Sequence, residues 1–130
     1  MINYDIPNSI SQYQPQAKLL NFSDLDFKPH RGTDDAVQAT LDLGNGLYIS
    51  VVANIGDGRG LYGNVEDDLY EVAIFNDDGM IPLSVSDDVL GWQSPIQVSK
   101  HMKDAQVNGE SWVNLLKSAR AEFRKDLDLD

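Results

Sequence analysis

The clearest pattern in the chain is an alternation of apolar and polar residues that starts after residue 36. Apolar side chains occupy every second position, at Val37, Ala39, Leu41 and Leu43. A repeat of two is the pattern of a strand with one buried face. The next three residues, 44–46, are Gly-Asn-Gly, which accept positive φ, and residues 47–53 are rich in β-branched and aromatic side chains. We therefore predict an antiparallel hairpin over residues 36–53.

Two further strands are expected before residue 86. Residues 55–64 contain four glycines in ten positions and predict a loop. Residues 69–75 read as a third strand, and residues 76–79 (Asn-Asp-Asp-Gly) have the composition of a turn. Residues 80–85 are expected to form a short fourth strand, at an edge because Pro82 cannot donate a hydrogen bond to a neighbour.

The carboxy-terminal third predicts helices. Residues 86–92 read as a linker, and Ser94, Pro95 and Gln97 match the signature of a capped helix start. That helix is expected to run to about Ala105, and a second one to begin near residues 108–109. The second helix carries one apolar stripe, formed by Trp112, Leu115, Leu116, Ala119 and Phe123.

The predicted fold is α+β: an antiparallel sheet of about four strands with one or two carboxy-terminal helices packed on one face. The 130 residues fit one domain with one core. Within it, residues 36–85 would form the sheet and residues 94–126 the two helices. Residues 1–35 have prolines and no periodicity, so they predict an extended or partly mobile arm with one helical turn near 16–20.

Composition excludes several classes of chemistry. The chain has no cysteine, so disulfides, thiol catalysis and cysteine zinc sites are excluded. The amino terminus shows no signal-peptide pattern, and the longest apolar stretch, residues 48–53, is far shorter than the roughly 20 residues of a spanning helix. These features predict a cytoplasmic protein that does not enter membranes.

Charge is distributed unevenly along the chain. There are 21 acids and 10 bases, for a net charge of -11. Residues 57–88 hold nine of the acids and one base, Arg59, so this segment carries -8. Direct binding to nucleic acid is disfavoured, because that requires clustered Lys and Arg. A basic protein surface or a bound cation is the electrostatically favoured partner.

Three segments resemble a pattern found in small proteins encoded by tailed bacteriophages. They are LYEVAIFNDDG at residues 69–79, SDDVLGWQSPIQVSKHM at residues 86–102, and YDIPN at residues 4–8. The resemblance covers about half of the chain. It implies a phage or prophage origin and implies no catalytic activity. The chain departs from the pattern in its longer segment between residues 15 and 36 and in its second helix.

The glycine loop is the most conspicuous candidate site. Glycines let a backbone approach a phosphate, and Arg59 could contact it, but no lysine of a phosphate-binding loop follows and no helix starts there. A flexible connection between strands explains the loop more simply. If the loop binds a partner, Arg59 and Tyr62 are the expected contacts, since Arg and Tyr are favoured at interfaces.

Acidic residues are the second candidate. Aspartate doublets lie on predicted turns, where nothing would desolvate them for acid–base catalysis, and their spacing does not match a calcium loop. His30 and His101 have no ligand or triad spacing, so we expect no metal, no cofactor and no catalytic residues. Trp92 and Trp112 are expected to fill the core. The residues expected to form an acidic partner-binding face are Asp57, Glu66, Asp67, Asp68, Asp77, Asp78, Asp87 and Asp88.

Three functions remain in competition at this point. The first is a non-enzymatic phage protein that binds and inhibits a host protein, for example a nucleic-acid-binding or defence enzyme, through an acidic surface that mimics DNA. The second is a structural or oligomer-forming phage protein that self-associates through its last helix. The third is a protein that binds or sequesters a small ligand with the 56–63 glycine loop.

Overall fold

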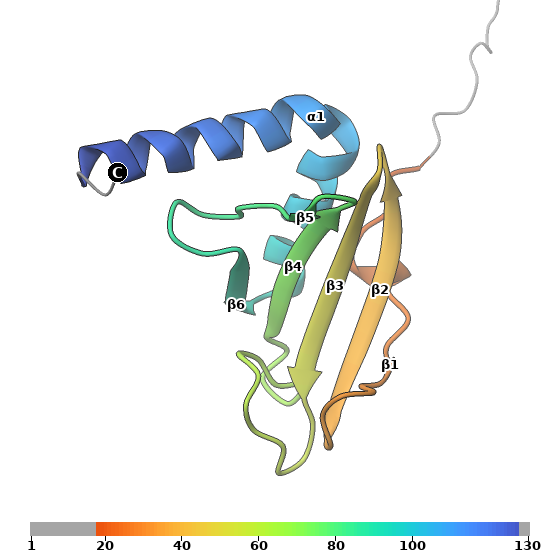
Figure 1. Cartoon of the computed structure of the whole chain (residues 1–130). Helices are drawn as coiled ribbons and strands as arrows, with labels where there is room; N and C mark the ends of the chain where they lie inside the picture. Colours follow the sequence, from red (N-terminus) through yellow and green to blue (C-terminus); the bar gives the residue numbers. More distant parts are fainter. Residues whose placement is uncertain (1–17, 128–130) are drawn as a thin grey trace, which may run out of the picture.

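The computed structural model describes residues 18–127, and in it one antiparallel sheet packs against one long helix (Figure 1). This arrangement confirms the predicted α+β class. The sheet has six strands in place of about four, because two very short strands join it. The elements in chain order are η1 (Phe22–Asp24), β1 (Lys28–Pro29), β2 (Ala36–Gly44), β3 (Leu47–Asn54), β4 (Tyr70–Asn76), β5 (Gly79–Met80), β6 (Val89–Gln93) and α1 (Pro95–Asp126).

The predicted hairpin is confirmed as β2 and β3. Ala39 pairs with Val51 and Leu41 pairs with Ile49, so the alternating apolar residues of both strands meet on one face. Asn45 takes the turn with a positive φ of 56°, a conformation that Asn adopts more readily than most residues. The hairpin supplies much of the hydrophobic core, and Ile49 and Val51 have no exposed surface.

The prediction of a fourth strand over residues 80–85 is wrong beyond Met80. Ile81 still donates a backbone hydrogen bond to Ile74, at 2.7 Å, but Pro82 has no N–H with which to continue the ladder. The chain leaves the sheet there and turns inward, and Ile81 and Leu83 are buried in the core. Residues 84–88 then form an exposed loop on the way to β6.

The prediction of a linker over residues 86–92 is also wrong, because residues 89–93 form strand β6 on the edge of β4. Tyr70 pairs with Gln93 and Val72 pairs with Leu90, so two residues of β6 lie opposite one residue of β4. This is a β-bulge, and Trp92 within it has a φ of +56°. Gly91 also has no room for a side chain, since a Cβ there would lie 2.5 Å from the Cβ of Tyr62.

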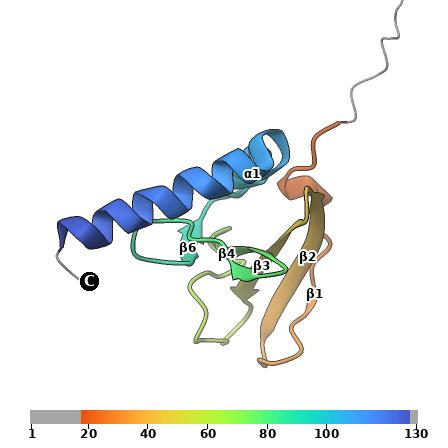
Figure 2. The ribbon, with the colours of Figure 1, turned by 45° about the horizontal axis from the view of Figure 1, so that its top comes forward.

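Helix α1 begins as predicted, with Ser94 and Gln97 forming a reciprocal capping box. It bends at Gly109, whose φ of 46° and ψ of -117° are not helical, and this confirms the predicted division into two helical parts. A Cβ at Gly109 would lie 2.9 Å from the Asn45 side chain. The first part packs on the sheet, and the second runs past the sheet edge (Figures 1 and 2).

The apolar stripe of the second helical part is only partly used by the domain itself. Trp112 and Val113 are buried in the core, and Leu116 packs against it. Leu115 is 67% exposed, and Ala119 is exposed as well. The predicted helical spacing is therefore correct, but the buried face of the helix is displaced by about one residue from the predicted stripe.

The predicted amino-terminal arm is described only from residue 18, and residues 1–17 lie outside the described part of the chain. Residues 18–20 are not helical, and the first helical turn is η1. Phe22 and Phe27 pack on Tyr70, with ring centroids 4.9 and 5.5 Å away. The Leu20 N–H donates to the side chain of Gln106 in α1, at 2.8 Å. This segment therefore packs along the helix.

Candidate functional site

The acidic residues predicted to share one face lie at three separate places. Residues 57 and 66–68 belong to the connection between β3 and β4, residues 77–78 to the turn at the other end of β4, and residues 87–88 to the loop before β6 (Figure 1). β4 has seven residues of about 3.3 Å each, so its two ends lie roughly 20 Å apart. The expectation of one continuous acidic face is therefore corrected to three groups.

The largest of these groups lies at the end of the domain where two connections meet, residues 31–35 and 55–69, which we call the acidic end. The Ile55 N–H donates to the Asp35 carbonyl oxygen at 2.8 Å. A Cβ at Gly58 would overlap that same oxygen, so only glycine fits there. Together the two connections hold six acids and two bases, for a net charge of -4. The acids are Asp34, Asp35, Asp57, Glu66, Asp67 and Asp68.

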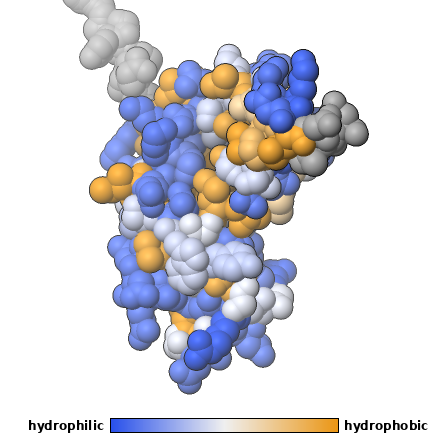
Figure 3. Space-filling model, turned by 90° about the vertical axis from the view of Figure 1, so that its left-hand side faces the viewer, coloured by the Kyte–Doolittle hydropathy of each residue, from blue (hydrophilic) through white to orange (hydrophobic). Residues whose placement is uncertain are grey.

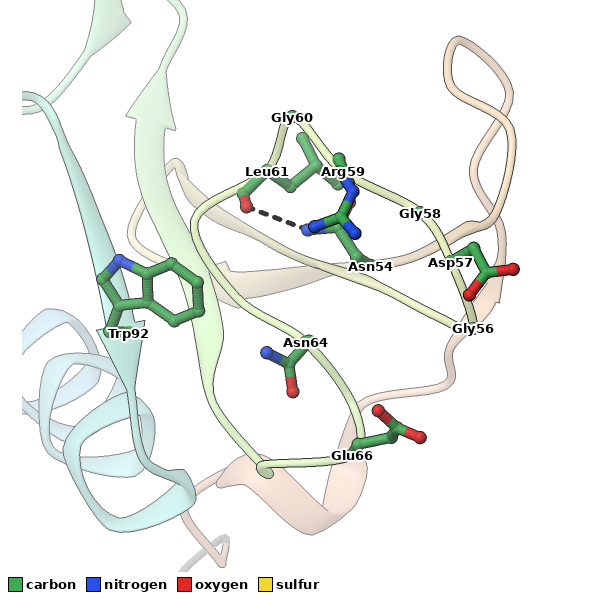
Figure 4. A pocket seen from close by; sticks show the side chains of 10 residues that line it. All are labelled: Asn54, Gly56, Asp57, Gly58, Arg59, Gly60, Leu61, Asn64, Glu66 and Trp92. Carbon is green, nitrogen blue, oxygen red and sulfur yellow. Dashed lines mark hydrogen bonds between the residues drawn. The ribbon is translucent and has the colours of Figure 1, made fainter.

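Asn54, the last residue of β3, holds the glycine loop in place. Its backbone N–H donates to the Gly63 carbonyl at 2.9 Å, and its own carbonyl accepts from the Val65 N–H at 3.0 Å. Its side-chain Nδ2 donates to the carbonyls of Leu61, at 2.9 Å, and Gly63, at 2.8 Å. One buried side chain thus joins both flanks of the loop, and Figure 4 shows the bond to Leu61.

A cavity of about 380 Å³ opens beside this loop (Figure 4). Its chemistry is mixed: two carboxylates, one guanidinium, two amides and one indole. The residues that line it are Asn54, Gly56, Asp57, Gly58, Arg59, Gly60, Leu61, Asn64, Glu66 and Trp92. The structure therefore brings together three predicted contact residues with two side chains, Asn54 and Trp92, that sequence reasoning did not assign to a site.

Trp92 is 50% exposed, so the prediction that it fills the core is wrong, while Trp112 is buried as predicted. The bulge in β6 explains the difference, because the left-handed backbone at Trp92 turns its side chain out of the sheet alternation. A positive φ is an uncommon, strained conformation for a bulky residue, and such strain occurs at turns, bulges and functional sites. Trp92 forms one wall of the cavity (Figure 4).

Tyr62, the other predicted contact residue, lies next to the cavity without lining it. Its backbone N–H donates to Glu71 Oε1 at 2.7 Å, and its carbonyl accepts from the Trp92 N–H at 2.8 Å. Its side chain is 61% exposed. Tyr62 therefore connects the loop to β4 and β6 through its backbone and leaves its ring free for contacts.

Asp88 differs from the other predicted acids because, within residues 18–127, it alone of them forms an ion pair. Its carboxylate accepts from Arg120 Nη1, and Arg120 Nη2 donates to the Ser84 carbonyl at 2.9 Å. The pair attaches the second part of α1 to the loop beneath it. Asp88 is therefore already neutralised by a neighbouring cation.

Two groups in the described residues have shifted pKa values. Burial, a hydrogen bond to Asp68 at 2.8 Å and the charge of Asp68 together raise the pKa of Tyr70 to about 12. Burial and the charge of Lys100 lower the pKa of His101, and Asp104 opposes this effect. His101 lies at the edge of the core and contacts Gln93 Oε1 at 3.0 Å, a place typical of a boundary residue.

Comparisons of the chain with protein-family models, curated proteins and solved structures found no match. Residues 18–127 contain no group of three or more His, Cys, Asp or Glu side chains placed to hold a metal ion. Within the same range, no helix has the length and apolar character needed to cross a lipid bilayer.

Proposed function

We propose that this protein is a non-enzymatic binding protein that attaches, by its acidic end, to a basic surface on a partner protein. The observation that carries the proposal is the concentration of six carboxylates beside only two guanidinium groups. No carboxylate of the acidic end takes part in an ion pair within residues 18–127, where the ion pairs involve Asp26, Asp88 and Asp104. Their field is therefore available to a partner.

The dispersed positions of the acidic doublets change the kind of contact that we propose. B-DNA carries one negative charge per about 1.7 Å of its axis, so a mimic of a long DNA segment needs carboxylates in a continuous track. The three separate groups favour a compact contact, in which the acidic end enters one basic depression. Complementary charge speeds such an encounter and orients it.

The resemblance to phage proteins supports the biological setting of the proposal. We propose that the chain is phage-encoded and inhibits a host protein that has a basic site, such as a nucleic-acid-binding or defence enzyme. The acidic end would occupy the surface where phosphates bind. Catalysis plays no part in this function.

Affinity capture from a bacterial lysate tests the proposal, with the wild type compared with a triple variant, Asp57→Asn/Glu66→Gln/Asp67→Asn. The matched control is Asp77→Asn/Asp78→Asn, which removes two charges from the opposite end of β4. We expect a basic protein to be captured at low salt by the wild type and the control and lost with the triple variant. Capture that is equal for all three, or that persists in 0.5 M salt, would contradict the proposal.

Self-association through α1 is a second candidate, favoured by the apolar residues exposed along its second part and at its end. Leu115 and Leu127 are 67% and 51% exposed, and Phe123 lines a hollow of about 390 Å³ together with Val85. Figure 3 shows apolar side chains gathered beside the end of the helix, while the lower end is largely hydrophilic. A concentration-dependent dimer in light scattering that Leu115→Lys abolishes would support this function.

A further inference from the structure

We infer that the cavity beside the glycine loop receives an arginine side chain of the partner protein. This inference rests on the proposed function and specifies the chemistry at the centre of the contact. Three observations carry it: an unpaired buried acceptor, a lining with a net negative charge, and an exposed indole that forms one wall.

The unpaired acceptor is Oδ1 of Asn54. This side chain is only 6% exposed, and both hydrogens of its Nδ2 are used by the carbonyls of Leu61 and Gly63. Oδ1 has no hydrogen-bond partner among the described residues. A buried acceptor without a donor is costly and rare in folded proteins. Because Asn54 lines the cavity, a guest that brings an N–H group would satisfy it.

The charged groups of the lining favour a cationic guest. Asp57 and Glu66 contribute two negative charges and Arg59 one positive charge, so the lining carries -1. Asn64 already uses its Oδ1 to accept one hydrogen bond, from the Asp67 N–H at 2.7 Å. The acceptors available to a guest are Asn54 Oδ1 and the two carboxylates. The carboxylates would repel a phosphate and attract an ammonium or guanidinium group.

Trp92 favours guanidinium over ammonium. A guanidinium is planar, stacks on aromatic faces and presents five N–H donors in a fixed fork, while an ammonium is a compact, strongly hydrated charge. A guanidinium that stacks on the Trp92 indole would still have N–H donors free to contact the other lining residues. Because Oδ1 is buried, the loop must open slightly to admit the guest, and glycines at positions 56, 58 and 60 leave the tip without side chains at these three positions.

The inference can be tested on the full chain with three small probes: acetyl-arginine methylamide, its citrulline counterpart and inorganic phosphate. Binding is followed by NMR shifts of the Asn54 side-chain amide and the Trp92 indole. Because the probe is small, we expect a dissociation constant in the millimolar range, on the order of 1 mM. Citrulline has nearly the same shape without the charge and should bind roughly tenfold more weakly. Phosphate should not shift these signals.

Arg59 gives the sharpest test, because the two possible guests predict opposite results. If the guest is a cation, Arg59→Gln removes a like charge and tightens arginine-probe binding roughly two- to fivefold. If the cavity holds an anion, the same variant abolishes phosphate binding, and the inference is overturned. Glu66→Gln and Trp92→Leu should each weaken the arginine probe roughly two- to fivefold. Asp77→Asn, at the opposite end of β4, should leave it unchanged.

Failure of the inference can be separated from failure of the proposed function. If a captured partner needs the acidic end but neither the arginine probe nor Trp92→Leu affects the complex, the proposed function stands and the inference falls. If the arginine probe binds but no salt-sensitive complex depends on the acidic end, the cavity has the guanidinium chemistry and the proposed function falls. Support for both requires that the probe competes with the partner.

Discussion

The acidic end and the loop of residues 81–88 have similar acidic doublets and different surroundings. At the acidic end, Asp67 follows Glu66 in an exposed turn, its backbone N–H bonds to Asn64, and its carboxylate has no cation partner within residues 18–127. In the other loop, Asp88 is paired with Arg120, a side chain that is only 18% exposed. A carboxylate in this protein therefore supports the fold where a cation lies beside it, and remains available to a partner where none does.

The largest effect should come from removing the residue that shapes the acidic end. Asn54→Ala deletes one buried and one partly buried hydrogen bond and leaves the Leu61 and Gly63 carbonyls without that donor. We expect a loss of about 2–3 kcal/mol in the free energy of unfolding, measured with urea. Asn64→Ala is the control, since its side chain makes one exposed bond and should cost less than ~1 kcal/mol. Equal losses would show that Asn54 has no special role.

The pair in the second loop should have the next largest effect. Arg120→Met leaves the Asp88 carboxylate and the Ser84 carbonyl without their donor, so we expect a loss of about 1–2 kcal/mol. Arg124→Met, one helical turn further along an exposed face, should change stability by less than ~0.5 kcal/mol. If both variants unfold at the same urea concentration, the pair does not attach α1 to the loop.

Asp68 is the one acid of the acidic end whose carboxylate accepts a hydrogen bond from another side chain in the described residues, that of Tyr70. The pH dependence of stability should show this interaction. The folded pKa of Tyr70 lies near 12, above its ordinary 10.0, so the folded state retains a proton that the unfolded state loses. Stability should therefore be complete below pH 10 and fall between about pH 10 and 12. Tyr70→Phe should remove this fall, and Asp68→Asn should reduce it while costing less than ~1 kcal/mol at pH 7.

The smallest stability effect should come from the triple variant Asp57→Asn/Glu66→Gln/Asp67→Asn, which we propose abolishes partner binding. These side chains are exposed and have no ion pair in the described part of the chain, so we expect a change below ~0.5 kcal/mol. The change should be towards greater stability, because three like charges are removed. A loss above ~1 kcal/mol would mean that these acids support the fold, as Asp88 does.

The elements that were predictable from sequence are those with local causes. The β2–β3 hairpin follows from a repeat of two and a Gly-Asn-Gly turn, and the helix start follows from Ser94 and Gln97. The bend at Gly109 matches the predicted start of a second helix near residues 108–109, and glycine is a poor helix former. β6 was missed because Gly91 and the preceding aspartates are typical of turns, while its pairing with β4 is a long-range contact.

The candidate site was predictable only in part for the same reason. The glycines, Arg59 and the acidic residues indicated a loop with charge, and these are properties of the local sequence. The burial of Asn54 and the exposure of Trp92 both depend on segments that are distant in sequence and meet at the loop. The positions of the other aspartate doublets likewise depend on β4, which separates residues 68 and 77 by its whole length.

The four hydrogen bonds of Asn54 have a consequence for how this protein can change over generations. They close the base of the glycine loop, so the sheet beneath does not rely on the residues at the tip. Substitutions of Asp57 and Arg59, or short insertions beside them, should therefore be tolerated by the fold, because lengthening a closed surface loop costs little, while Gly58 must remain glycine. Such a loop could acquire a new binding preference while the rest of the fold stays the same.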